Sequence, residues 1–541
     1  MKLLQKTISL ALSAVLLTPL CASAATEKVY SDVPTAHWAE AVIQKAGEYG
    51  LMQGFDNGAF GLGRNLSRAE FVTILARMFG WSGHGTGQTF ADVPPDKWYY
   101  TAVELAAAAG VAEAGEAFRP EAPITRREMA EMLVSALGYD HIAAQDWSTP
   151  FADVSGEGSG YLAVAYDIGM TNGVESFGRL LFQPEDNATR EEAAAMLVRV
   201  YERWSARLEW LHGFYAISSY SQIDLGTAMD GVSVGWAKLE RDEGGTPFLN
   251  HNRTETNDWV RPTDYNDVLD VFTTANIPVN LNIFTSDPSF FLTPEARVST
   301  ISAIVATSVD YAGITMDVEG LKGQDVRAAY AAFMAELKAA LPPEKTLYVC
   351  VQPDTWYDGF DYRALGEACD KVILMAHDYQ WTSVPASYVG TDKTSTPVTP
   401  INEVYRALRS ITDPDTGVAD RSKLALAISF ANVGLAVDEN GLLAGDKLYR
   451  PAVSTVYTRL KQTDSQMGWS DVYQNPYLYY TTEDGGRYRL WYEDSRSVEA
   501  KVRLARMFGI NSVSLWRLGT IPNYPDEGLY FDVWDTLQAM R

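Results

Sequence analysis

Residues 313–321 read Gly-Ile-Thr-Met-Asp-Val-Glu-Gly-Leu and have the alternation of a buried β-strand. Apolar side chains alternate with three polar ones, Thr315, Asp317 and Glu319. Because side chains on a strand repeat every two residues, the two carboxylates point the same way, about 6–7 Å apart. In a parallel barrel that direction is inward, and chemistry takes place at the carboxyl end of the strand. When two carboxylates lie close together in a site of low dielectric, the pKa of one of them is raised. This stretch therefore predicts an acid that stays protonated near neutral pH.

Apolar strands alternate with helical stretches on both sides of this segment, from about Trp210 onward. Such alternation indicates a parallel α/β sheet, and eight strands are the number found in a (β/α)8 barrel. A Tyr- and Gly-rich insertion at 433–490 is expected to form a small α+β subdomain between strands seven and eight. The expected strands are Trp210–Ala216, Gly231–Trp236, Pro278–Phe284, Gly313–Val318, Thr346–Val351, Lys371–Ala376, Leu424–Phe430 and Ser512–Trp516, with helices at Val298–Tyr311, Val326–Ala340 and Val498–Phe508.

An internal repeat occupies the first two hundred residues. The sequence Tyr-Ser-Asp-Val-Pro at 30–34 recurs as Phe-Ala-Asp-Val-Pro at 90–94 and as Phe-Ala-Asp-Val at 151–154. A second motif, Ser/Thr-Arg-x-Glu, begins at Ser67, Thr125 and Thr189. These residues suit helix N-caps, and the Glu three residues later completes a capping box. Each repeat therefore predicts a helix, a glycine-containing loop and a second helix.

The repeats resemble surface-layer homology (SLH) modules, with boundaries expected at 28–82, 88–142 and 149–205. The resemblance implies three all-α modules that pack as a pseudo-threefold unit and bind a pyruvylated secondary cell-wall polymer. Arginine forks at helix starts suit a ketal carboxylate, although each arginine could instead bridge neighbouring modules. The third repeat lacks the tryptophan of the other two. The residues implied in polymer binding are Arg68, Arg126, Arg190, Asp32, Asp92, Trp38 and Trp98.

The N-terminal residues have the pattern of a secretory signal, expected to span 1–24. Lys2 and Lys6 precede an apolar core at 8–17, and Ala-Ser-Ala at 22–24 is a typical cleavage site. The formal net charge of −25 argues against nucleic acid and anionic membrane surfaces as partners. We therefore expect a secreted bacterial cell-surface protein associated with the S-layer. Because Cys21 lies in the leader, Cys350 and Cys369 could form at most one disulfide.

The region 209–541 resembles family-18 glycoside hydrolases, in particular the spore-cortex and cell-wall N-acetylglucosaminidase branch. Besides the segment at 313–321, the motifs are Lys-Val-Ile-Leu-Met-Ala-His-Asp-Tyr at 371–379, Trp-Tyr-Glu-Asp at 491–494 and Ser-Leu-Trp-Arg-Leu-Gly at 514–519. In this family the acetamido group of the substrate is the nucleophile. The resemblance implies that Glu319 is the general acid and that Asp317 orients the acetamido group. Asp378 would assist from the opposite wall, and Trp516 would form the floor of the subsite that binds the reacting sugar.

The sequence departs from the family pattern in two places. Ala312 and Thr315 stand where the family has two further acids, so the proton balance around Asp317 must differ. His377 stands beside Asp378 where a tyrosine hydroxyl is usual, and its imidazole could donate the same hydrogen bond or simply pair with Asp317 or Asp378. Trp491 and Trp381 are further stacking residues on this interpretation, although packing under the loops explains either equally well.

The expected function is hydrolysis of a β-linked, N-acetylglucosamine-containing glycan, peptidoglycan or a chitin-like polymer, by a retaining, substrate-assisted mechanism. The alternative is a catalytically inactive barrel that binds glycans at the cell surface. A glycosidase for a polymer without acetamido groups would need a second nucleophile, which the sequence does not suggest. The six histidines include no ligand-spaced pair and no glycine-rich phosphate loop follows a strand, so neither metal nor cofactor is expected.

Overall fold

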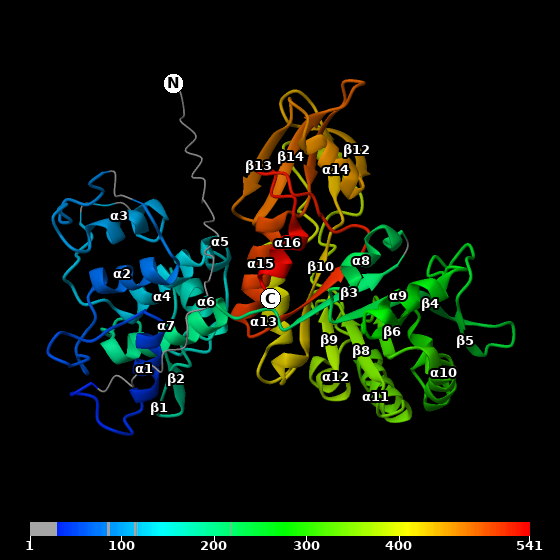
Figure 1. Cartoon of the computed structure of the whole chain (residues 1–541), viewed down its shortest axis with the longest axis horizontal. Coiled ribbons are helices and arrows are strands. Elements are labelled where there is room, and N and C mark those ends of the chain that lie inside the picture. The colour runs from blue at the N-terminus through cyan, green and yellow to red at the C-terminus, as the bar shows by residue number, and fades with distance from the viewer. Residues whose placement is uncertain (1–29, 84–86, 113–114, 116, 217) are drawn as a thin grey trace. The chain divides into compact units, whose positions relative to one another are not determined.

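The computed structural model describes residues 30–541 except 84–86, 113–114, 116 and 217. It consists of two compact units (Figure 1). The first holds the described residues of Met1–Leu105, Glu116–Ile124 and Asn187–Val198, and the second holds those of Ala106–Gly115, Thr125–Asp186 and Arg199–Arg541. The predicted signal segment lies outside the described residues. No helix within the described part of the chain is both long and apolar enough to cross a bilayer.

Helix pairs form each of the three sequence repeats, as predicted. They are α1 (Glu40–Glu48) and α2 (Arg68–Met78), α3 (Tyr100–Ala108) and α4 (Arg126–Ala136), and α6 (Ser159–Asp167) and α7 (Arg190–Trp204), with a short α5 (Asp140–Ala143) between the second and third pairs. The capping boxes that start α2 and α4 are present as expected. The third repeat departs from an all-helical module, because β1 (Val174–Ser176) and β2 (Arg179–Leu181) form an antiparallel ribbon in it.

A ring of backbone hydrogen bonds joins the three repeats just before their second helices. The amide of Leu66 donates to the carbonyl of Ala188, that of Ala188 donates to Ile124, and that of Ile124 donates to Leu66, at 2.9 to 3.0 Å. Each repeat thus satisfies a backbone donor of one neighbour and an acceptor of the other. This cyclic exchange is the arrangement expected of a pseudo-threefold unit.

Eight parallel strands close into a barrel in the second compact unit. Their order around the ring is β3-β16-β10-β9-β8-β7-β6-β4, and β3 pairs with β4 to close it. Both faces of these strands are covered, which is why all six residues of β7 are buried. The strands are β3 (Trp210–Tyr215), β4 (Gly231–Arg241), β6 (Val279–Thr285), β7 (Gly313–Val318), β8 (Thr346–Val351), β9 (Lys371–Leu374), β10 (Leu424–Ser429) and β16 (Ser512–Trp516).

Helices follow most of the barrel strands and cover the outside of the ring (Figure 1). The helices predicted from sequence are found with their starts moved two to four residues earlier. The helices around the ring are α8 (Ile223–Gly226), α9 (Tyr265–Thr274), α10 (Pro294–Thr307), α11 (Gln324–Ala340), α12 (Tyr362–Ala368), α13 (Ile401–Ile411), α15 (Ser495–Met507) and α16 (Val533–Ala539), and the three predicted from sequence are α10, α11 and α15.

The second barrel strand is five residues longer than predicted. β4 continues past Trp236 to Arg241 and pairs there with β5 (Pro247–Asn250) in an antiparallel hairpin. The register to β6 shifts between Val234 and Ala237, which marks the irregularity at which β4 leaves the regular ladder. The extension carries a polar loop to the carboxyl end of the barrel.

The predicted insertion is a five-stranded antiparallel sheet with one helix (Figure 1). Its core contains Val456 and Leu460 from the helix and Leu478 and Leu490 from the sheet. The strands lie in the order β12-β11-β15-β14-β13. The elements are β11 (Val433–Val437), β12 (Leu443–Tyr449), α14 (Val453–Leu460), β13 (Gln466–Ser470), β14 (Asn475–Thr481) and β15 (Arg487–Trp491).

Candidate functional site

Asp317, one residue before the end of β7, is a buried carboxyl group with little hydrogen bonding. It is 2% exposed. The Asn282 side chain donates to Oδ2 at 3.4 Å, and Oδ1 has no partner among the described residues. Burial, and then the charge of Glu319, raise the pKa of Asp317 to about 7. A raised pKa is what the strand pattern predicted for one acid of this pair.

Glu319 lies just beyond the end of β7 and is partly buried. Burial raises its pKa, the negative charge of Asp378 raises it further, and the charge of His377 opposes both effects. The side chain thus feels charged groups at the end of β9, two strands away around the barrel. A carboxyl group whose pKa is raised by desolvation has the property required of a general acid.

His377 and Asp378 follow β9 and form a hydrogen-bonded pair. His377 Nδ1 lies 2.8 Å from Asp378 Oδ2, and Gln380 donates to Oδ1 at 3.3 Å. Asp378 has a φ of 65°, in the left-handed region, which turns the chain sharply after the strand. Desolvation raises the pKa of Asp378, but the hydrogen bond and charge of His377 outweigh it and bring that pKa to about 2. Asp378 is therefore the ionised acid of the group.

Thr315, predicted to contact substrate, faces the barrel interior below the mouth. It is fully buried, and its hydroxyl lies 2.7 Å from that of Ser233. Ser233 in turn bonds His212 Nε2 at 2.9 Å, and His212 Nδ1 bonds Ser514 at 2.8 Å. Burial, with a smaller effect of the Lys371 charge, lowers the pKa of His212 to about 3, so this chain of groups is neutral. An uncharged network therefore occupies the place of the missing inner acid.

Trp516 ends β16 at the barrel mouth, where the sequence placed it. Its ring meets Phe214 edge-on at 5.2 Å between centroids and lines a cavity of about 240 Å³. Trp259, which sequence reasoning missed, lies 5.9 Å from Trp516 and stacks on Phe284 at 4.8 Å. The two indoles together form an aromatic wall at the mouth.

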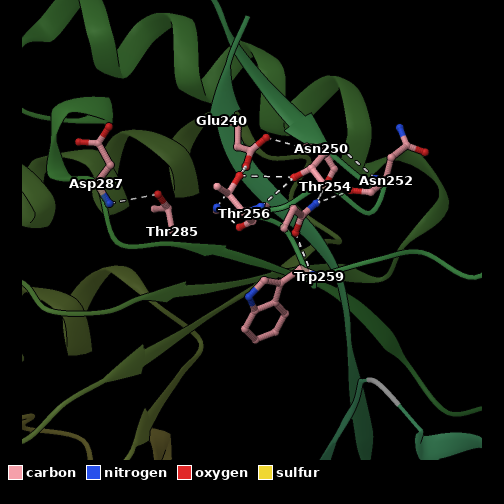
Figure 2. Close-up of polar contacts among 10 residues, drawn as sticks. Glu240, Asn250, Asn252, Thr254, Thr256, Trp259, Thr285 and Asp287 are labelled. Carbon is pink, nitrogen blue, oxygen red and sulfur yellow. Dashed lines mark hydrogen bonds and ion pairs between the residues drawn. The ribbon is translucent and has the colours of Figure 1, made fainter.

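A polar network from the β4–β5 hairpin holds the loop that carries Trp259 (Figure 2). Asn257 accepts a hydrogen bond from the Trp259 amide at 2.8 Å and donates to the carbonyls of Asn250 and Asn252. Asn250 donates to Glu240 at 2.7 Å. A lone tryptophan in a polar loop has no periodic signal, and only the unpredicted extension of β4 brings it to the mouth.

The other two tryptophans proposed from sequence pack into the protein. Trp491 is 1% exposed, donates from Nε1 to the Ser395 carbonyl at 2.8 Å and packs against Val398 and Val433. Trp381 is half-buried against an apolar cluster that includes Leu435. For Trp491 this burial matches the packing alternative, since the indole has no free face for a sugar.

The three repeat arginines all donate to carbonyls of the next repeat. Arg68 Nε donates to Phe118 at 2.7 Å, Arg126 Nε to Phe182 at 2.9 Å and Arg190 Nε to Phe60 at 2.9 Å. Arg126 and Arg190 are buried, at 6% and 5% exposed. Arg190 also pairs with Glu70 at 3.1 Å. These contacts have the bridging geometry that was the alternative to ligand binding, and ligand contact by the arginines remains a prediction.

A cavity of about 170 Å³ opens in the first compact unit beside one of these arginines. Arg190, Arg77 and Trp98 line it, together with residues that precede α2 and residues of α2 itself, among them Glu70, the ion-pair partner of Arg190. Trp98 and its counterpart Trp38 are 64% and 62% exposed. Two guanidinium groups beside an exposed indole suit an acidic sugar.

The predicted groove aspartates fix loop backbone. Asp32 accepts hydrogen bonds from the amides of Phe60, Gly61 and Leu62, at 2.7 to 2.9 Å. Asp92 accepts from the amides of Phe118 and Arg119 at 2.8 and 2.7 Å. Since Phe60 and Phe118 supply the carbonyls that the arginines bind, the aspartates and arginines hold the same loops from opposite sides.

Cys350 and Cys369 are buried free thiols, and Cys350 lies on β8 as the strand pattern indicated. Within the described ranges, no group of three or more His, Cys, Asp and Glu side chains is placed to hold a metal ion.

Residues 291–520 match the family model described as Glycosyl hydrolases family 18, and residues 29–72 and 89–130 match the S-layer homology domain. The chain carries a family-18 glycosyl hydrolase domain and S-layer homology domains. The matched family-18 segment contains Asp317, Glu319, His377, Asp378 and Trp516. The strands β3, β4 and β6, which complete the ring, lie before it.

Several known proteins are similar to this chain. The cortical fragment-lytic enzyme of Bacillus anthracis is 26% identical over 252 residues, 44% of this chain and 54% of that protein. The S-layer protein sap of the same organism is 26% identical over 224 residues, 40% of this chain and 26% of that protein. The crystal structure of the Bacillus cereus spore cortex-lytic enzyme SleL has a TM-score of 0.47 and 18% identity, covering 69% of this chain and 83% of that one. The chain spans about half the length of the lytic enzymes it matches.

Proposed function

We propose that the protein is a cell-wall-anchored glycoside hydrolase that cleaves β-linked, N-acetylglucosamine-containing glycans with retention of configuration. The observation that carries the proposal is the division of charge at the barrel mouth. Asp317 and Glu319 have raised pKa values, whereas that of Asp378 is held near 2. One proton donor and one permanent anion are thus available at neutral pH.

In the proposed reaction, Glu319 protonates the glycosidic oxygen as the bond to the anomeric carbon breaks. The acetamido oxygen of the same sugar attacks that carbon from the opposite face, and the ring so formed carries positive charge. Asp317 holds the acetamido N–H and, when ionised, stabilises that charge. Glu319, now a carboxylate, removes a proton from the water that opens the ring. The anomeric configuration is therefore retained.

The proton balance of Asp317 differs from that of the family motif because its lower neighbour is Thr315. Thr315 belongs to the neutral chain through Ser233 and His212, so no inner acid shares a proton with Asp317. Burial and the charge of Glu319 raise the pKa of Asp317 instead. His377 stabilises Asp378 at 2.8 Å and leaves it as the counter-charge across the mouth.

The S-layer homology domains support attachment of the barrel to a secondary cell-wall polymer at the bacterial surface. The cavity lined by Arg77, Arg190 and Trp98 offers positive charge and an aromatic face for such a ligand. Similarity to an S-layer protein agrees with that location. The anchor would keep the hydrolase close to its insoluble substrate.

The test is turnover of a chromogenic N-acetylglucosamine oligomer and of purified peptidoglycan by the wild type and by Glu319→Gln. Loss of the acid should lower kcat by about two to four orders of magnitude while glycan binding persists. Glu344→Gln, an exposed carboxyl in the turn before β8, is the matched control and should retain wild-type turnover.

A catalytically inactive, glycan-binding barrel is the competing function. It would be supported if the wild type binds these glycans but releases no reducing ends from either substrate. The neutral environment of Thr315 would then be the first place to restore an acid, by Thr315→Asp. Turnover by the wild type that Glu319→Gln does not reduce would instead contradict the assigned acid.

A further inference from the structure

The cavity beside Trp516 has two arginines on its walls. Its volume is about 240 Å³, and its lining comes from the end of β10, from the turn between β12 and α14, and from the end of β16. Arg450 enters from the insertion, and Arg517 follows Trp516 directly. The chain carries a formal charge of −25, so two guanidinium groups on one cavity of the barrel mouth run against its overall charge.

Hydrogen bonds fix both sides of this cavity. Asn432, which is 5% exposed, donates to the Pro451 carbonyl at 3.1 Å and so ties the turn that carries Arg450 to the end of β10. On the other side, the Arg517 amide donates to Thr520 Oγ1 at 3.2 Å. The two arginines therefore project from backbone that is held in place, which lowers the entropic cost of binding a ligand between them.

The state of each arginine indicates an anionic ligand. Arg450 is exposed, and no side chain among the described residues pairs with it. Its charge is the smallest of the effects that lower the pKa of Asp378, behind those of His377 and Gln380. Burial lowers the pKa of Arg517, which means that its cation has lost part of its hydration. A partly desolvated guanidinium gains more from an incoming anion than a hydrated one does.

We propose that Arg450 and Arg517 form a subsite for a carboxylate on the glycan, next to the sugar that packs on Trp516. A neutral chitin-like chain has no group for this pair. A wall glycan in which N-acetylglucosamine alternates with a sugar bearing a lactyl ether does where no peptide is attached to the ether, since the ether then ends in a carboxylate. This inference rests on the proposed function and narrows its substrate to acidic, peptidoglycan-type strands.

The experiment compares three substrates: a chromogenic N-acetylglucosamine oligomer, peptide-free peptidoglycan strands, and the same strands after conversion of their carboxyls to methylamides. The wild type should cleave the acidic strands with a higher kcat/KM than the methylamides. Arg450→Gln should lose about 10- to 100-fold on the acidic strands and change less than about threefold on the other two substrates. Arg450→Lys should keep part of the preference.

Lys447→Gln is the matched control, because Lys447 is an exposed cation on β12 of the same insertion and does not line the cavity. It should leave the preference for acidic strands unchanged. Equal losses by Arg450→Gln on all three substrates, or a wild type that does not distinguish acid from methylamide, would overturn the subsite.

Failure of the proposed function gives a different result. If the wild type cleaves none of the substrates, titration calorimetry of the acidic and methylamide strands decides the inference independently of turnover. Tighter binding of the acidic strands that Arg450→Gln removes would support the carboxylate subsite on a binding protein. Equal binding of the two, or binding of neither, would overturn the subsite as well.

Discussion

A buried acid with few partners is the feature of single residues that most affects this barrel. Asp317 is 2% exposed and receives one long hydrogen bond, from Asn282. Ionising it in place is costly. On the proposed mechanism, the acetamido N–H and the positive charge of the intermediate would stabilise the ionised form that the free site disfavours.

Replacing Asp317 by Asn should change how stability depends on pH. The folded pKa is about 7 and the ordinary value 3.8, so between these pH values the folded state holds a proton that the unfolded state has lost. The free energy of unfolding of the wild type should consequently fall as pH rises from about 4 to 8, by roughly 2–4 kcal/mol. Asp317→Asn should remove most of that fall and be the more stable protein at pH 8.

Urea unfolding at pH 5 and pH 8 measures this effect. Asp310→Asn changes an exposed carboxyl three residues before β7 and should retain the wild-type pH dependence. An Asp317→Asn variant that loses stability with pH as steeply as the wild type would show that other groups carry the dependence.

At the scale of elements, one buried ion pair connects α15, the helix before the last barrel strand, to the insertion. Lys501 of α15 is fully buried and donates to Glu493 at 2.7 Å and to Asn475 of β14 at 3.0 Å. Ser497 donates to the same Glu493 oxygen at 2.6 Å, and Asn475 donates to the other oxygen at 2.8 Å. The Trp-Tyr-Glu-Asp motif and the Ser and Lys that follow it are thus a structural joint.

Glu493→Gln should leave Lys501 as a buried, unpaired cation. We expect it to lower the free energy of unfolding by about 3–5 kcal/mol, and the double variant Glu493→Gln with Lys501→Met should recover much of the loss. Glu499→Gln on the same helix breaks only a partly exposed pair with Arg503 and should cost less than about 1 kcal/mol. Chemical denaturation of the four proteins checks these values, and equal effects of the two single variants would contradict the assignment.

Some elements could be predicted from sequence alone and others could not. β7, β8 and β16 begin and end where the apolar patterns predict, because strands buried on both faces leave an uninterrupted apolar signal. The extension of β4 was missed, since Lys238, Glu240 and Arg241 read as loop until β5 pairs with them. Trp259 and the partners of Thr315 were missed for a related reason: their neighbours come from distant strands, and a single sequence does not record such contacts.

At the scale of the whole molecule, net charge and local charge have opposite signs where ligands are expected. A chain of charge −25 repels acidic polymers at long range, but salt screens this repulsion within about 8–10 Å. The cavity lined by Arg77, Arg190 and Trp98 then presents the opposite sign at short range. Attachment to the wall should therefore depend on contacts inside the cavity and only weakly on the electrostatic field of the whole chain.

Trp98→Ala should separate attachment from turnover. The indole is 64% exposed and lines the cavity, so its removal should weaken binding to purified cell-wall polysaccharide by about tenfold or more without unfolding the protein. Hydrolysis of a soluble chromogenic oligomer should remain at the wild-type rate. Co-sedimentation with cell walls measures the first effect, and Phe177→Ala in the third repeat, fully exposed at the tip of its ribbon, is the control. Unchanged sedimentation of Trp98→Ala would place the polymer elsewhere.

The ring of backbone hydrogen bonds among Leu66, Ala188 and Ile124 also sets an order in time. A chain is synthesised from its N-terminus. The amide of Leu66 therefore has no acceptor in the ring until Ala188, more than 120 residues later in the sequence, has been made. Arg190, whose guanidinium donates to the Phe60 carbonyl, is synthesised equally late. Closure of the ring is therefore a late step. A nascent or truncated chain that ends before residue 188 lacks α7 and has no closed ring.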